Sequence, residues 1–165
     1  MKQLFFIMLA AALLSCERRG DTLQLLEKRI DSLENELAGA YKPGFGELMS
    51  AIQTHHAKLW FAGKNKNWPL AAFEVKELNE VLADILKYQN ERPESRWLGM
   101  ISPALDSIAL AVEQKNEEHF GTAYRQLTRS CNACHRQTHF EYNVVILPRR
   151  SPFTNQDFRA SVPPK

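Results

Sequence analysis

Apolar residues recur at helical spacing through most of this chain. Four stretches carry apolar positions every three or four residues: 45–62, 68–86, 102–112 and 116–140. Such spacing places one apolar stripe along an α-helix, and no stretch before residue 141 alternates apolar and polar residues as a strand does. The pattern therefore predicts an all-α fold. The short connections favour an antiparallel four-helix bundle over residues 44–140.

Prolines and polar residues predict where these helices begin and end. Pro69 and Pro103 suit a first helical turn, and Ser102 and Asn116 can cap helix starts through their side-chain oxygens. Residues 90–96 are predicted to form a polar break. The predicted core stripes consist of Phe45, Leu48, Met49, Ile52, His56, Leu59 and Trp60; Leu70, Phe73, Leu78, Val81, Leu82, Ile85 and Leu86; Leu105, Ile108, Ala109 and Val112; and Phe120, Ala123, Tyr124, Leu127 and Cys131.

A shorter amphipathic pattern lies in the segment of residues 16–43. Five apolar residues follow spacings of three and four in turn, as at the a and d positions of a coiled coil: Leu23, Leu26, Ile30, Leu33 and Leu37. The seam lasts little more than two heptads, and isolated helices this short are marginal in water. It predicts either a stalk that forms a homo-oligomer or an amphipathic helix lying on the domain or the membrane. The many charges between residues 21 and 36 favour the stalk.

The last 25 residues, 141–165, have a different character. Residues 144–147 read Val-Val-Ile-Leu, and four of the chain's 8 prolines follow them. This composition predicts an irregular tail that lies over the helices through its aromatic residues and frays at its end.

The amino terminus has the pattern of a secretion signal. A lysine precedes an apolar run over residues 4–14, which is too short to span a bilayer but fits the core of a signal peptide over residues 1–15. The run ends in Leu-Leu-Ser-Cys, which resembles a bacterial lipobox. The resemblance implies that Cys16 is lipidated and anchors the chain to a membrane. Glu17 after it favours the outer membrane, facing the periplasm. The alternative is an ordinary signal peptide with an incidental cysteine.

Charge and composition exclude several functions. The formal net charge is +2, and no basic stripe with interleaved aromatic residues is present, so no nucleic-acid partner is expected. No catalytic pair of carboxylates, nucleophile with a base or phosphate-binding loop is recognisable, so the chain is not expected to be an enzyme.

The remaining two cysteines stand in the sequence Ser-Cys-Asn-Ala-Cys-His, residues 130–135. Cys-x-x-Cys-His is the attachment signature of c-type haem, in which Cys131 and Cys134 form thioethers and His135 becomes the proximal iron ligand. Three alternatives exist. A redox pair would need a βαβ setting, a zinc site would need a fourth ligand such as His139, and a structural disulfide would not need His135.

Residues 45–140 resemble the cytochrome c-prime family and its six-coordinate relatives. The resemblance rests on Lys-Asn-Glu-Glu-His-Phe-Gly-Thr-Ala-Tyr before the cysteines and on Gly-Glu-Leu-Met-Ser-Ala-Ile-Gln-Thr-His-His in the first helix of the bundle. It implies one covalent haem c on the last helix of the bundle. It also implies that Met49 is a candidate distal iron ligand, because some members have a ligating methionine there.

Three further side chains are candidates near a haem. His56 shares a helix face with Met49 and is expected to contact the haem pocket, His55 is expected at the surface or rim, and Arg136 is a candidate partner for a propionate.

These observations predict a membrane-anchored monohaem c-type cytochrome that carries single electrons between redox proteins of the cell envelope. Two alternatives stay open at this point. One is a five-coordinate haem protein that binds or senses small gases, and the other is a non-haem lipoprotein with a zinc or disulfide site.

Overall fold

The computed structural model describes residues 20–37, 39 and 42–160. Over these residues the regular elements are helices, without a strand, and the predicted all-α class is confirmed. The chain divides into two compact units, one up to Lys42 and one from Pro43 onward, and each is described by itself. The predicted signal peptide and Cys16 lie outside the described residues.

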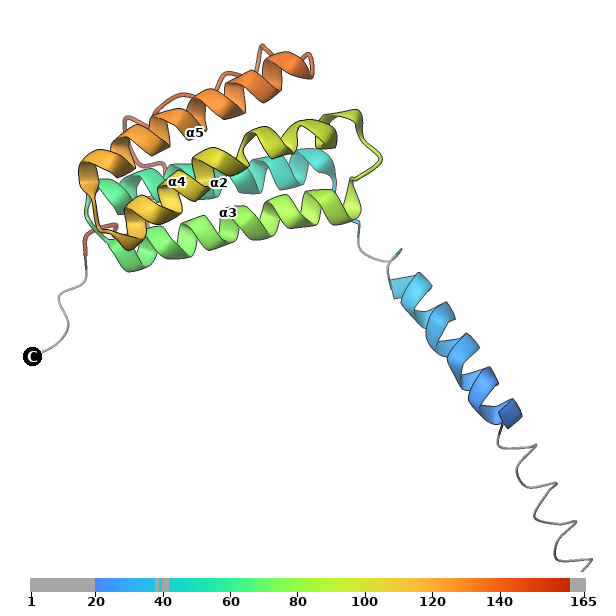
Figure 1. The fold of residues 1–165 in the computed structure, drawn as a ribbon. Helices are drawn as coiled ribbons and strands as arrows, with labels where there is room; N and C mark the ends of the chain where they lie inside the picture. The colour runs from blue at the N-terminus through green and yellow to red at the C-terminus, as the bar shows by residue number, and fades with distance from the viewer. Residues whose placement is uncertain (1–19, 38, 40–41, 161–165) are drawn as a thin grey trace, which may run out of the picture. The chain divides into compact units, whose positions relative to one another are not determined.

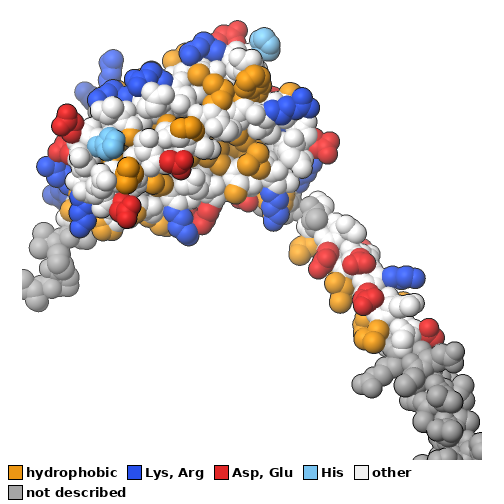
Figure 2. Space-filling view, viewed as in Figure 1, with side chains coloured by type: hydrophobic (Ala, Val, Ile, Leu, Met, Phe, Trp, Pro, Cys, Tyr) orange, Lys and Arg blue, Asp and Glu red, His pale blue; other side chains and the backbone are white. Residues whose placement is uncertain are grey.

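The first unit contains the predicted heptad helix. Residues 20–37 and 39 are helical, and all five seam residues are exposed, from 51% for Leu26 to 75% for Leu37. Figure 2 shows hydrophobic side chains along one edge of this helix, with acidic side chains beside them. The unit thus presents an apolar stripe with no cover from its own residues.

Four α-helices and one 3-10 helix form the second unit. They are α2 (Phe45–Lys64), α3 (Trp68–Tyr88), η1 (Pro93–Met100), α4 (Ser102–Glu113) and α5 (Glu117–Gln137). Helix α2 packs on α3, α3 on α4, α4 on α5, and α5 on α2. Figure 1 shows these four helices side by side, so their apolar faces enclose one common core.

Two helix starts are capped by side chains. The Asn67 side chain accepts a hydrogen bond from Leu70 N at the start of α3, and the predicted cap Asn116 accepts one from His119 N at the start of α5. The prediction that Ser102 caps α4 was wrong, because α4 already includes Ser102. An N-cap residue normally has extended backbone. Here η1 leads directly into α4, so the preceding backbone is already helical.

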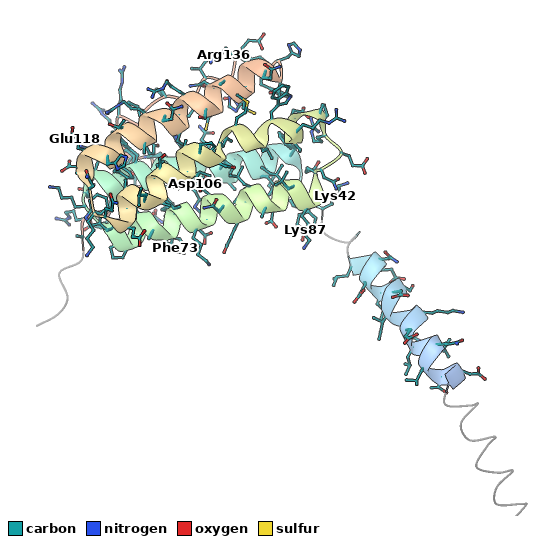
Figure 3. The ribbon with its side chains drawn as sticks, viewed as in Figure 1. Lys42, Phe73, Lys87, Asp106, Glu118 and Arg136 are labelled. Atoms are coloured by element: carbon teal, nitrogen blue, oxygen red, sulfur yellow. The ribbon has the colours of Figure 1, made fainter. Side chains whose placement is uncertain are left out.

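Burial follows the predicted stripes in most places and departs from them on the second helix. Phe73 and Leu86 were predicted in the core but are 49% and 54% exposed. Phe73 is 200° of helical rotation from buried Ala71, and it points away from the other helices in Figure 3. The neighbouring residue Glu74 is buried in place of Phe73 on the face of α3 that packs against the other helices. Ala109 was likewise predicted in the core but is exposed.

The predicted polar break over residues 90–96 was also partly wrong. Its second half belongs to η1, where Glu94, Ser95 and Leu98 are buried. Ser95 Oγ donates to Gln89 O at 2.7 Å, and Arg92 pairs with Glu94 at 2.8 Å. These bonds satisfy the polar groups, so polar residues can be buried at the edge of the core.

The tail is irregular, as predicted, and returns along the helices (Figure 1). Its aromatic residues pack on α2, where the Phe158 ring lies 5.5 Å from that of Phe61. Lys58 lies 5.1 Å from the Phe153 ring. Further on, Arg159 O accepts from Asn67 at 3.0 Å. The tail therefore covers part of the helical unit.

Candidate functional site

The Cys-x-x-Cys-His motif occupies the last two turns of α5. Residues three and four apart lie on one side of a helix, so Cys131, Cys134 and His135 share a face. The helix ends immediately afterwards, where Thr138 Oγ1 donates to Cys134 O at 2.9 Å and His139 adopts a left-handed backbone with φ 64. Phe140 N then donates to His135 O at 2.7 Å, which satisfies a terminal carbonyl of the helix.

A cleft of about 230 Å³ lies against this face. Helix α5 lines it from one side and α2 from another, and the rest of the wall comes from η1, the tail and Leu82 of α3. Most of its exposed wall is apolar, so it suits a large apolar group with a few polar contacts. The lining residues used below are Met49, His56, Cys131, Cys134, His135, Asn143 and Val145.

The two thiols are buried and free. Burial raises the pKa of Cys131 to about 12 and also raises the pKa of Cys134. Redox-active cysteines have lowered pKa values, because the thiolate is the reacting form. A dithiol held protonated in this way does not have the electrostatics of a redox pair.

The imidazole of His135 is oriented by the tail. Its Nδ1 lies 2.6 Å from the backbone carbonyl oxygen of Asn143. A carbonyl only accepts, so Nδ1 carries the hydrogen and donates it. The neutral ring then has its lone pair on Nε2, which is the form that binds a metal through Nε2.

Met49 is half-buried on α2 and lines the same cleft. Its thioether is a soft donor of the kind found as an axial ligand in c-type cytochromes. The structure thus brings the predicted distal candidate and the predicted proximal candidate to one cleft from two different helices.

His56 lies in the same wall, but both its ring nitrogens are occupied. Nε2 is 3.1 Å from Thr128 Oγ1, and Nδ1 is 2.9 Å from Tyr124 Oη. The Thr128 hydroxyl donates to Tyr124 O, so it accepts from His56 Nε2–H. The tyrosine hydroxyl donates to His56 O at 2.7 Å, so its one hydrogen reaches Nδ1 only as a shared, weaker bond. His56 therefore links α2 to α5 as a neutral ring.

Acid is expected to destabilise the chain through His56. Burial lowers its pKa from 6.5 to about 4, so the unfolded state binds the extra proton between these two values. Stability from this residue is fully present above pH 6.5 and is lost as the pH falls to about 4, by about 3 kcal/mol in total. Urea unfolding of wild type and His56→Gln at pH 7.5, 5.5 and 4.5 measures this. An equal loss in both proteins would contradict the assignment.

The other predicted candidates lie elsewhere. Arg136 is exposed on the outer side of α5 (Figure 3) and is outside the cleft lining, so its propionate contact stays a prediction without support. His139 is also exposed and outside the lining. Within the described parts of the chain, no group of three or more His, Cys, Asp or Glu side chains could hold a metal ion.

His55 is neither at the surface nor at the rim of the cleft. Its side chain is 17% exposed, and Nδ1 lies 2.7 Å from a carboxylate oxygen of Glu74, which is 1% exposed. Nε2 is 3.9 Å from Glu77. The prediction for His55 was wrong because α3 supplies carboxylates that local sequence around His55 does not reveal.

The sequence did not predict the roles of two asparagines, Asn143 in the cleft wall and Asn132 beside it. The Asn132 side chain bonds to the backbone of Val145, which lines the cleft, and its position inside the motif was the only local signal. Asn143 contributes a backbone carbonyl, which no side-chain pattern can indicate.

The donor set fits a covalently bound haem. Two thiols and one imidazole share a helix face, the imidazole has a bare Nε2, and a thioether lines the same apolar cleft. In comparisons with protein-family models, characterised proteins and solved structures, the chain matches none.

Proposed function

We propose that this chain is a membrane-anchored monohaem c-type cytochrome that carries single electrons in the cell envelope. The observation that carries the proposal is the meeting of Cys131, Cys134, His135 and Met49 at one apolar cleft. Cys131 and Cys134 would hold haem c through thioethers, and His135 Nε2 and Met49 Sδ would be its axial ligands. When bound, the haem supplies an iron that cycles between two oxidation states.

Two features of the protein's own residues support electron transfer over ligand binding: the apolar lining of the cleft and the placing of the two iron donors on joined helices. The mostly apolar lining would limit the access of competing ligands once a haem fills the cleft. The two axial donors come from α2 and α5, and the His56 bonds to Tyr124 and Thr128 join these helices. In this proposal α2 to α5 form an antiparallel four-helix bundle of the cytochrome c-prime type, with the haem attached to its last helix.

Anchoring is proposed through a lipid on Cys16, most simply at the periplasmic face of the outer membrane. None of the helices in the described segments is long and apolar enough to cross a bilayer. A diacylated or triacylated cysteine would hold the chain stably at a membrane without such a helix.

We further propose that the heptad helix pairs with a second copy in parallel. In a parallel pair, Arg29 at position g faces Glu34 at position e of the partner, which is an attractive contact. An antiparallel pair would bring Glu27 towards Glu34, which is repulsive, although it would also bring Arg29 towards Glu36, which is attractive. Parallel pairing also puts both lipid anchors at the same end. Sedimentation equilibrium of residues 17–165 tests this, and the mass of a single copy at all concentrations would contradict it.

The deciding experiment for the haem is the reduced absorption spectrum of residues 17–165, exported to a periplasm that contains haem-maturation machinery. A low-spin c-type spectrum that carbon monoxide leaves unchanged is expected. A high-spin spectrum that shifts with carbon monoxide would favour gas binding instead. A colourless protein would contradict both haem functions and leave the zinc or disulfide alternatives.

A further inference from the structure

The start of the tail is fastened to α5 by one side chain of the haem-attachment motif. The amide of Asn132 donates to Val145 O at 2.8 Å and accepts from Val145 N at 2.8 Å. Residues 140–147, called the strap below, thus gain two backbone hydrogen bonds at one point, as in a pair of β-strands. The strap residues Val145 and Leu147 also pack against the hydrophobic core.

The same strap supplies the acceptor for His135. Asn143, two residues before Val145, presents its carbonyl oxygen 2.6 Å from His135 Nδ1. Asn143 N donates to Phe140 O at 2.9 Å, which fixes the turn that leads into the strap. Asn132 and His135 are three residues apart on α5, and their partners are two residues apart on the strap. The position of one contact therefore determines the position of the other.

We propose that Asn132 is a positioning residue for the proximal ligand, which it controls by holding the Asn143 carbonyl against His135. The inference rests on the proposed haem function. When an imidazole binds a metal through one nitrogen, a hydrogen bond donated by its other nitrogen fixes the ring's orientation and tautomer. That bond also makes the ring a stronger donor to the metal. A stronger donor stabilises the oxidised iron. The Asn132–Val145 contact, called the clasp below, is therefore expected to give the haem a lower reduction potential than it would have if the strap were detached from α5.

The test replaces Asn132 by alanine in the haem-loaded chain. Loss of both bonds to Val145 is expected to free the strap, to speed amide exchange at Val145, and to raise the midpoint potential. Gln137→Ala is the matched control. Gln137 is exposed on the same helix and lies outside the cleft lining, so this variant is expected to leave the potential and the Val145 exchange rate unchanged. Asn132→Asp keeps only the acceptor for Val145 N and should fall between wild type and Asn132→Ala.

Two readouts separate this inference from the proposed function. Amide exchange at Val145 reports the clasp whether or not haem is bound, whereas the potential reports its effect on the iron. Fast exchange with an unchanged potential would overturn the positioning role of Asn132. An unchanged rate of amide exchange at Val145 would show that Asn132 does not hold the strap. A chain without haem would overturn the proposed function, while Asn132→Ala would still show its effect on exchange. If Asn132→Ala fails to fold, Asn132→Asp decides by the same two criteria.

Discussion

Replacing Met49 by alanine is expected to turn a haem that ignores carbon monoxide into one that binds it in a one-to-one ratio. Met49 is the one methionine among the residues that line the cleft. In the proposed haem protein, removing its thioether would leave the iron without its second protein ligand. His56 cannot easily take its place, because both its ring nitrogens are already hydrogen-bonded. Since a methionine ligand raises the potential of a haem, the midpoint potential is also expected to fall.

Carbon monoxide titration of the reduced protein, followed by absorption, measures this change. Met100→Ala is a suitable control, because Met100 is 39% exposed at the end of η1 and does not line the cleft. The control should behave as wild type. If the wild-type protein itself binds carbon monoxide and Met49→Ala binds it no better, Met49 is a core residue and the iron is open.

Replacing His55 by alanine is expected to reduce the free energy of unfolding by about 3 kcal/mol at pH 7. The variant leaves the Glu74 carboxylate buried in the helix interface without its cationic or donor partner at 2.7 Å. The other carboxylate oxygen, Oε1, already lacks a hydrogen-bond partner among the described residues. A buried carboxylate without its partner destabilises the folded state. Removal of one member of a buried pair is therefore more harmful than removal of both.

Denaturant unfolding of three proteins tests the pair: wild type, His55→Ala and the double variant His55→Ala/Glu74→Leu. The double variant should recover most of the lost stability, because it has no charge to bury. A deficit that persists in the double variant would show that His55 acts by packing alone.

Features determined by local sequence could be predicted well here. Helix positions follow from the apolar period, and the cap at Asn116 follows from residue type. The Cys-x-x-Cys-His motif places its three candidate ligands on one face of the predicted helix, because they are three and four residues apart. The candidate Met49 needed a family resemblance, because a lone methionine in a helix stripe is more often a core residue than a ligand.

Features that depend on pairing between distant segments could not be predicted. Glu74 is buried and Phe73 exposed, against their hydropathy, because His55 on another helix offers a partner to the carboxylate. The strap is similar, since Asn132 and Val145 are 13 residues apart and meet only after the chain has reversed direction. In both places a polar contact between elements decided the outcome, and a pattern read along one element contains no information about it.

The path of the tail also determines the order of events during maturation. The connections between α2 and α3 and between α4 and α5 are short, so these contacts are local and are expected to form first. The contacts from His56 to Thr128 and from Asn67 to Arg159 join residues 72 and 92 apart and are expected to form later. The strap follows the cysteines in the sequence and is therefore translated after them. In the proposed cytochrome, the thiols would stay open to an attachment enzyme until the strap closes over the cleft.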